Sequence, residues 1–396
     1  MKIGYFCNPW NIGHERDYGD ILNEVRELAQ FCEQAGFDNF WLAEHHFSIW
    51  GREMLCNPLL MAADLAARTE RIRIGLAAAI ITFWHPLRLA EDIALLDQLC
   101  DGRLELGVGR GNYGLEGLNL NPKADPNNPA DNFGVFEDTI NIVKKALSQP
   151  RFRYDGAKYT IPYPGFKTDQ AHPVNHPDYV DQETGELRYI STYPRPRQTP
   201  YPPLWQVVDS PSSIEFAARN DLGIIMWRPP VEALRERCNL YRESAASVGI
   251  DLPFGARTGI SRDVHIASSR EEARRIAGKG VMDALNFSNW RGPRIFLRPG
   301  ETFAPGQEDA LKKELPFEFV DERSLIFGPP EYAIEKFKEL RDDLNLEQIN
   351  MKMGWPGMGQ RPILRSLELF AERVLPELRR DEPVSPVAVD ATGAAA

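Results

Sequence analysis

Residues able to do chemistry follow three successive predicted strands in the stretch 41–111. Glu44-His45-His46 ends the first strand, and histidine titrates close enough to neutral pH to act as a general acid or base. Residues 75–80 (GLAAAI) lie within the second of these strands, where small side chains leave room for a flat ligand. Residues 107–111 (GVGRG) close the third, and Arg110 has the planar fork that binds phosphate. These residue types indicate acid–base chemistry beside a bound ligand.

Each of these patterns also has a structural interpretation. Neighbouring strand residues point to opposite faces, so Glu44 and His46 share one side and His45 takes the other, an arrangement that also suits hydrogen-bonded histidines at a rim. Small residues also suit close packing of a helix on a strand, and an arginine at a strand end is often structural. The other histidines show no ligand spacing, so no metal site is predicted.

A fourth candidate lies at residues 209–213 (DSPSS), where a later strand turns into a helix. Ser210 is a natural N-cap and Pro211 suits the first helical position, so capping alone explains the sequence. A helix N-terminus with free hydroxyls also binds phosphate. Arg110 and this helix follow consecutive predicted strands, so we expect them to converge on one anion.

The polypeptide itself offers no strong nucleophile. It shows no Ser-His-Asp or Cys-His arrangement of recognisable spacing, and no lysine stands out at a predicted strand end. Demanding chemistry is therefore expected to depend on a cofactor, with the protein supplying position and electrostatics.

Strand and helix patterns alternate along the chain. In the helix at 20–35, the predicted buried face is Ile21, Val25, Leu28, Ala29 and Cys32; in the helix at 86–100, it is Leu89, Ile93, Leu96 and Leu99. Strands are predicted over 2–7, 37–43, 71–81, 104–108, 204–208, 223–227, 262–267 and 348–353. Further helices are predicted over 57–67, 133–148, 210–220, 231–248, from 269 onward, and over 329–342 and 362–378.

Eight strands, each followed by a helix, predict a (β/α)8 TIM barrel of the α/β class. The irregular stretches at about 150–203 and 290–327 are predicted insertions after the fourth and seventh strands, and we expect both to form a lid. Residues 1–380 are predicted to be one domain and 381–396 a disordered tail. A doubly wound open sheet is the alternative, but the turn after the first strand lacks its glycine-rich sequence.

Composition narrows the classes of partner. The 396 residues carry a formal charge of −11, which argues against nucleic acid as a main partner. No apolar run reaches membrane-spanning length, and the N-terminus lacks the pattern of a signal peptide. The five scattered cysteines predict neither a disulfide framework nor a zinc site. A cytoplasmic protein is expected.

Several motifs together resemble the bacterial luciferase-like flavin monooxygenases, and the alpha subunits of luciferase in particular. The resemblance is densest over 37–118 and 204–227, is weaker but collinear through Leu378, and does not cover the first insertion. It rests on the segments EHHF (44–47), AA (77–78), HP (85–86), AED (90–92), LLDQ (95–98), GR (102–103), GRG (109–111) and DSPSS (209–213).

The resemblance implies a (β/α)8 barrel that binds FMN, reduced by a separate flavin reductase, or the deazaflavin F420. It assigns Glu44 and His45 to catalysis, and Ala77-Ala78 to the peptide, cis in luciferase, that lies against the flavin ring. Arg110, Ser210 and Ser213 match the phosphate-binding positions, with Asp209 standing where luciferase has Glu. Gly109 replaces a reactive cysteine of luciferase, which weakens any claim of light emission.

The function that the resemblance implies is a monooxygenase that uses reduced FMN and O2, through a C4a-(hydro)peroxyflavin, to oxygenate a small organic substrate. An F420-dependent oxidoreductase and a non-catalytic FMN-binding protein are the alternatives. A homodimer is expected. Aromatic residues near strand ends are predicted to wall off water, and the predicted substrate pocket consists of Trp10, Trp50, Tyr113 and Trp227.

Overall fold

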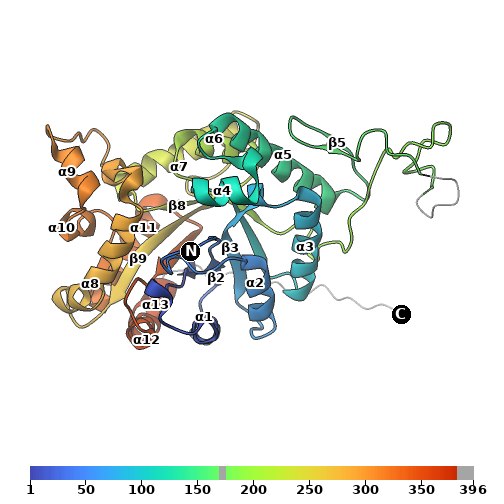
Figure 1. The fold of residues 1–396 in the computed structure, drawn as a ribbon. Helices are drawn as coiled ribbons and strands as arrows, with labels where there is room; N and C mark the ends of the chain where they lie inside the picture. Colours follow the sequence, from blue (N-terminus) through green and yellow to red (C-terminus); the bar gives the residue numbers. More distant parts are fainter. Residues whose placement is uncertain (169–174, 381–396) are drawn as a thin grey trace.

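Eight parallel strands close into a barrel in the computed structural model, which describes residues 1–168 and 175–380 (Figure 1). Hydrogen bonding runs in the order β1, β2, β3, β4, β7, β8, β9 and β11, and β11 returns to β1. The predicted TIM barrel is therefore confirmed. Its strands are β1 (Lys2–Cys7), β2 (Asn39–Leu42), β3 (Arg73–Ile80), β4 (Leu104–Gly109), β7 (Leu204–Val207), β8 (Gly223–Trp227), β9 (Thr258–Ile266) and β11 (Gln348–Lys352).

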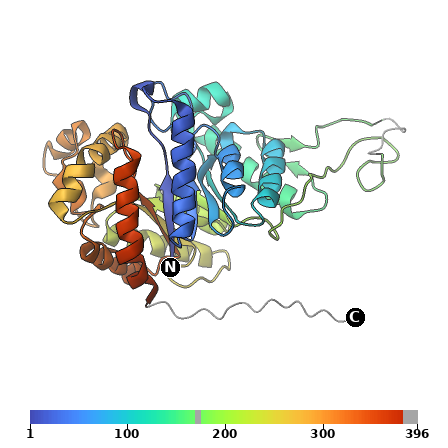
Figure 2. The ribbon, with the colours of Figure 1, turned by 90° about the horizontal axis from the view of Figure 1, so that it is seen from below.

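Helices cover the outside of the barrel (Figures 1 and 2). In α1 (Tyr18–Gln34) the buried residues are the five predicted from helical spacing, and Asn57 caps α2 (Pro58–Ala66) by accepting a hydrogen bond from the Leu60 amide. The others are α3 (Pro86–Leu99), α5 (Pro129–Ser148), α6 (Pro211–Arg219), α7 (Val231–Ala246), α8 (Arg270–Phe287), α11 (Pro330–Leu344), α12 (Gln360–Leu369) and α13 (Leu375–Arg380).

Several predicted boundaries and elements were wrong. Strand β9 begins four residues before the predicted start, at Thr258, and the short strand β10 (Ile326–Gly328), which pairs with β9, was not predicted. Helix α4 (Gly114–Leu120) was also missed. The predicted closing helix at 362–378 is interrupted by a π-helical segment, Phe370–Val374. The predicted disordered tail at 381–396 lies outside the described residues.

Large side chains fill the barrel interior because glycines on neighbouring strands make room for them. Trp41 and Trp205 are buried there and pack edge to face with ring centroids 6.3 Å apart. A Cβ atom on Gly75 would lie 2.3 Å from the Trp41 ring, and one on Gly223 would lie 2.5 Å from the Trp205 ring. Small residues at these positions therefore serve the packing of the core.

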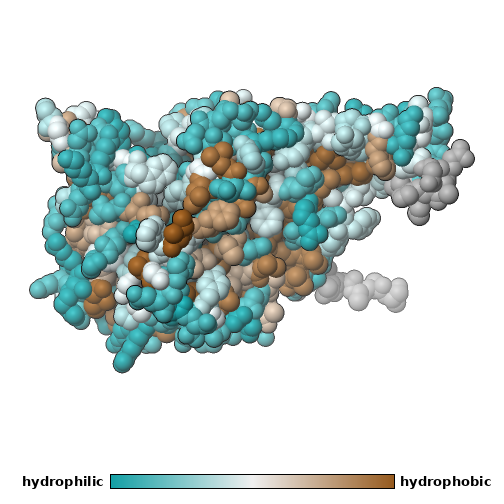
Figure 3. Space-filling model, viewed as in Figure 1, coloured by the Kyte–Doolittle hydropathy of each residue, from teal (hydrophilic) through white to brown (hydrophobic). Residues whose placement is uncertain are grey.

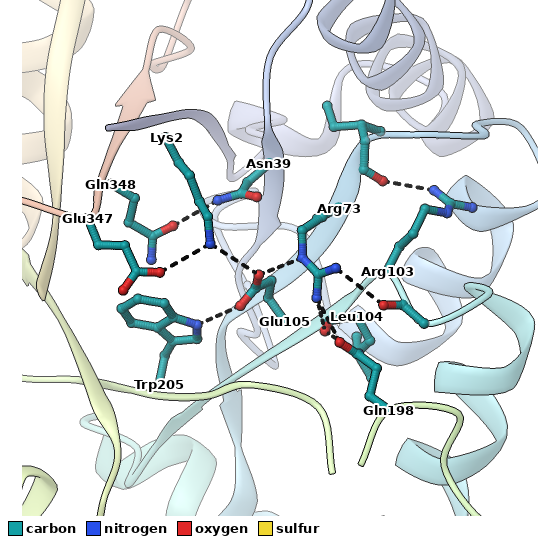
Figure 4. Close-up of polar contacts among 12 residues, drawn as sticks. Lys2, Asn39, Arg73, Arg103, Leu104, Glu105, Gln198, Trp205, Glu347 and Gln348 are labelled. Atoms are coloured by element: carbon teal, nitrogen blue, oxygen red, sulfur yellow. Dashed lines mark hydrogen bonds and ion pairs between the residues drawn. The ribbon is translucent and has the colours of Figure 1, made fainter. Parts of the chain in front are cut away.

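A polar network closes the N-terminal end of the barrel (Figure 4). The carboxylate of Glu105, which is 1% exposed, accepts hydrogen bonds from Arg73 Nε at 2.6 Å and Trp205 Nε1 at 2.7 Å, and Lys2 Nζ lies 4.0 Å away. Gln198 accepts a hydrogen bond from Arg73 and donates one to the carbonyl of Leu104. A buried carboxylate paired in this way is well compensated.

The first insertion was expected to form part of a lid, and this expectation was wrong. The insertion projects away from the mouth of the barrel (Figures 1 and 2). Its described part contains the short hairpin of β5 (Tyr154–Asp155) and β6 (Thr160–Ile161). The chain returns along the N-terminal side, where Gln198 donates its backbone and side-chain N–H groups to the buried carboxylate of Asp97. Within the described residues, no helix is long and apolar enough to cross a bilayer.

Candidate active site

A cavity of about 450 Å³ lies at the C-terminal ends of the barrel strands. Its volume falls within the usual range for small-molecule sites. Residues from the ends of β2, β3, β4, β7, β8 and β11 line it, as do residues from the second insertion. This is the face on which TIM barrels carry their active sites.

The carboxylate of Glu44 is fully engaged in hydrogen bonds behind the cavity wall. It is 1% exposed and accepts from the Ile80 amide at 2.6 Å and Trp84 Nε1 at 3.1 Å. The His46 ring nitrogen Nε2 lies 2.9 Å from it, which agrees with the predicted shared face of the two residues. Glu44 therefore ties the end of β2 to the end of β3 and reaches the cavity at its edge.

His45 faces the cavity between two carboxylates. Its Nε2 lies 3.6 Å from Glu53 Oε1, and its Nδ1 lies 3.4 Å from Glu116 Oε1. Burial disfavours the charged ring, but Glu53 and Glu116 outweigh that effect and raise the pKa of His45 above its ordinary value. The imidazole is thus placed to hold or release a proton at the cavity near neutral pH.

Glu53 is also held by two further donors. Tyr113 Oη donates to Glu53 Oε2 at 3.2 Å, and Asn8 Nδ2 donates to Glu53 Oε1 at 3.2 Å. Burial and the charge of Glu53 raise the pKa of Tyr113, so its hydroxyl stays protonated. Sequence reasoning missed Glu53 and Glu116 because they lie outside β2, in segments with no recognisable motif.

Ala77, Ala78 and Gly109, which have a methyl side chain or none, line one part of the cavity wall. The peptide bond between Ala77 and Ala78 is cis, as the resemblance implied. A Cβ atom on Gly109 would lie 3.1 Å from the Cβ atom of Ala78, so glycine keeps this wall open.

Arg110 presents its guanidinium to the cavity from the end of β4. Its backbone carbonyl is fixed by Thr82 Oγ1 and Asn132 Nδ2, both at 3.0 Å. In the described chain, no carboxylate lies within ion-pair distance of this guanidinium, which sits 5.8 Å from the Phe133 ring centroid. Burial lowers the pKa of Arg110, a penalty that a bound anion would relieve.

The predicted second half of the phosphate site lies beside the cavity. Asp209 lines it, whereas Ser210 and Ser213 sit at the start of α6 and are not among the lining residues. Ser210 Oγ accepts from the Ser213 amide at 3.3 Å, so the capping interpretation is confirmed. Asp209 pairs with Arg291 of the second insertion, which thus contributes to the cavity lining. The expected role of this insertion as a lid stays a prediction.

Five cationic side chains that the sequence did not single out also line the cavity: Arg228, Arg237, Arg291, Arg294 and Lys352. Two of them have carboxylate partners, since Arg291 pairs with Asp209 and Arg294 with Glu308. Arg228 Nε and Arg237 Nη1 are buried without a hydrogen-bond partner. Lys352 ends β11, which corrects the expectation that no lysine stands at a strand end.

Two of the four predicted pocket aromatics line the cavity. These two are Tyr113 and Trp227. The Trp227 ring packs edge to face against Phe6, with ring centroids 4.6 Å apart. The structure does not bring Trp50 to the cavity, because its side chain is 71% exposed. Trp10 lines a neighbouring pocket and lies 5.3 Å from Lys352 Nζ. Aromatic type alone could not separate these positions.

Comparison with known proteins yields one family model and several relatives. The model, described as luciferase-like monooxygenase, matches residues 1–345. Limonene 1,2-monooxygenase of Rhodococcus erythropolis is 24% identical over 385 residues, which cover 96% of this chain and 87% of the relative. The oxygenase component of flavin-dependent trigonelline monooxygenase from Acinetobacter baylyi is 27% identical over 224 residues, covering 57% of this chain and 53% of the relative.

Among solved structures, the oxygenating constituent of 3,6-diketocamphane monooxygenase from Pseudomonas putida, in complex with FMN, superposes with a TM-score of 0.72. It is 21% identical, and the match covers 95% of this chain and 98% of that one. This likeness establishes a shared fold.

Proposed function

We propose that this chain, which belongs to the luciferase-like monooxygenase family, is the oxygenase of a two-component system that uses reduced FMN and O2. A separate flavin reductase would supply the reduced FMN, and a small organic substrate would receive one oxygen atom. The relative named as an oxygenase component supports the two-component arrangement. One observation carries the proposal: His45, the Ala77–Ala78 wall and Arg110 line one cavity.

The residues present fit a phosphorylated flavin. Arg110 is a half-buried cation without a carboxylate partner among the described residues, as a phosphate site requires. We place the phosphate between Arg110 and the start of α6, where Ser210, Ser213 and the unpaired Arg237 Nη1 would complete its shell. Ala77, Ala78 and Gly109 offer a wall of small residues for the ring system.

Reduced FMN, when bound, would supply the two electrons for activating O2, so that one oxygen atom would enter the substrate and the other would leave as water. The chain's own residues control protons and water. His45, whose pKa is raised by Glu53 and Glu116, would donate a proton from Nε2 when the ring is charged and accept one there when it is neutral. Glu44 is proposed as a positioning residue, because its oxygens are already committed to Ile80, Trp84 and His46.

We also propose a homodimer through α2 and α3. Leu60, Leu95 and Leu99 on these helices are 71%, 48% and 56% exposed, and Figure 3 shows apolar colour over this part of the surface. Light scattering coupled to gel filtration tests this, with Leu95→Lys expected to give monomers and Val248→Lys, equally exposed but away from α2 and α3, as the control.

Anaerobic titration with reduced FMN tests the function, followed by rapid mixing with oxygenated buffer. We expect saturable FMNH2 binding and then a transient oxygen adduct at flavin C4a, distinct in absorbance from oxidised FMN. Tight binding of F420 with no such transient would support hydride transfer instead. If the protein binds flavin but no tested substrate changes the rate at which the bound reduced FMN is reoxidised, a non-catalytic role would be favoured.

A further inference from the structure

We propose that Lys352 and Arg228 form a second anion site in the cavity, which binds the carboxylate of a small organic substrate. Only the identification of the bound carboxylate as a substrate rests on the proposed function. The anion site itself is argued from the placement and burial of these two side chains and from their lack of a carboxylate partner.

Lys352 is a buried cation that points into the barrel. Gln348 and Asn350 alternate with apolar residues along β11; Gln348 bonds across the interior to Asn39, and Asn350 fills the space beside Gly4. Lys352 continues this inward face at the cavity and is 7% exposed. Its ammonium lies 5.3 Å from the centroid of the Trp10 ring, and no side-chain hydrogen bond or ion pair joins Nζ to a described residue. A cation–π contact replaces only part of the hydration that a buried ammonium loses, so an anionic partner would stabilise it.

Arg228 directly follows β8, which a single strand, β9, separates from β11, and it lines the same cavity as Lys352. Its Nε is buried without a partner, and no carboxylate of the described chain pairs with its guanidinium. Burial is the main cause of the lowered pKa of Lys352, and the charge of Arg228 lowers it further. Asp263 and Glu53 act in the opposite direction and favour the charged ammonium. Two neighbouring cations that repel each other are stabilised by one shared anion.

The cofactor phosphate cannot occupy this place and the Arg110 site at once. Around the closed barrel, three strands separate β4, which leads to Arg110, from β11, which carries Lys352, in either direction. The two cations therefore stand on opposite sides of the mouth. A flavin anchored at Arg110 leaves the Lys352 side for another ligand.

No carboxylate among the described lining residues is free to neutralise Lys352 and Arg228, and Asp263, opposite Lys352 on β9, accepts a hydrogen bond from Trp355 Nε1. The lining carboxylates already have partners: Glu44 holds the end of β3, Glu53 holds His45 and Tyr113, and Asp209 pairs with Arg291. Phe6 and Trp227 form an apolar wall beside the two cations. The complementary ligand is thus a carboxylate with an apolar or aromatic body.

Benzoate and benzamide are matched probes, because they share a shape and differ in charge. With FMN-loaded protein, we expect calorimetry to show benzoate binding at least tenfold tighter than benzamide. Lys352→Met and, separately, Arg228→Met should weaken benzoate at least tenfold and change benzamide less than twofold. Lys279→Met, on an exposed face of α8, is the control and should change neither.

Equal affinity for the two probes in the wild-type protein would overturn the proposal, as would equal loss of both in the variants. Weakened FMN binding with unchanged benzoate binding would overturn it too, because Lys352 would then serve the flavin. The same titration in FMN-free protein keeps the two proposals apart. If FMN does not bind but benzoate binding still depends on Lys352, the proposed function fails and the anion site stands.

Discussion

His45 Nε2 lies 3.6 Å from Oε1 of Glu53, a carboxylate eight residues further along the chain that also receives the hydroxyl of Tyr113. The imidazole therefore has a charged partner on the cavity side and a second one, Glu116, behind it. This pairing makes the protonation state of His45 depend on Glu53.

Glu53→Gln should lower the pKa of His45, because it removes a negative charge that favours the imidazolium. Because the pKa of His45 is higher in the folded than in the unfolded protein, protonation of this ring stabilises the fold. The contribution is complete at pH values below the unfolded pKa, near 6.5, and is lost as pH rises through the folded pKa. The variant should therefore lose more stability at pH 5.5 than at pH 8.5.

NMR titration of the His45 ring and urea unfolding at the two pH values measure these effects. Glu243→Gln, on the exposed face of α7, is the control and should change neither. A His45 pKa that is unchanged in Glu53→Gln would show that Glu116 alone sets it.

Arg110→Ala should weaken FMN binding by roughly 10- to 100-fold, since hydrogen bonds to charged groups contribute about 1.5–3 kcal/mol. Riboflavin, which lacks the phosphate, should bind the variant and the wild-type protein alike. Arg88→Ala, on the exposed side of α3, is the matched control. Equal losses for FMN and riboflavin would place Arg110 against the ring system or in the fold instead.

Glu44→Gln should cost about 1–3 kcal/mol of unfolding free energy, because an amide NH2 would face groups that donate to the carboxylate now. Trp84→Phe removes one of those donors and should cost less. Urea unfolding of the two single variants and the double variant should show coupling of at least about 0.5 kcal/mol. Strictly additive losses would contradict the hydrogen bond between the two side chains.

Gly75→Ala should destabilise the protein by about 3 kcal/mol, since the new Cβ would overlap the buried Trp41 ring. Gly359→Ala is a useful comparison, because its Cβ would meet nothing within 4 Å and its φ is −80°. It should cost less than about 1 kcal/mol, as expected for an N-cap position. Thermal or urea unfolding distinguishes the two, and similar losses would disprove the packing argument.

Periodicity alone predicted the barrel because each strand and each helix carries its own apolar pattern. The buried face of α1 was predicted residue by residue. On α3, however, Leu99 was expected inside and is 56% exposed. An apolar stripe cannot by itself distinguish a face that meets the core from one left on the surface.

The site was only partly predictable, because its residues meet through closure of the barrel. Arg110, Glu44 and His45 were found from local motifs beside strand ends. Glu53 and Lys352 carry no motif, and their places depend on tertiary contacts. The polar alternation of Gln348, Asn350 and Lys352 in β11 was the signal available for Lys352, since it marks an inward polar face.

The filled interior of the barrel has a kinetic consequence. Trp41, Trp205 and the network around Glu105 occupy the space beneath the cavity, so the described chain leaves the C-terminal mouth as the way in and out. Two molecules that share one entrance cannot exchange independently. If the proposed function holds, cofactor and substrate would pass through this one mouth, so the rate at which either leaves would depend on whether the other is bound.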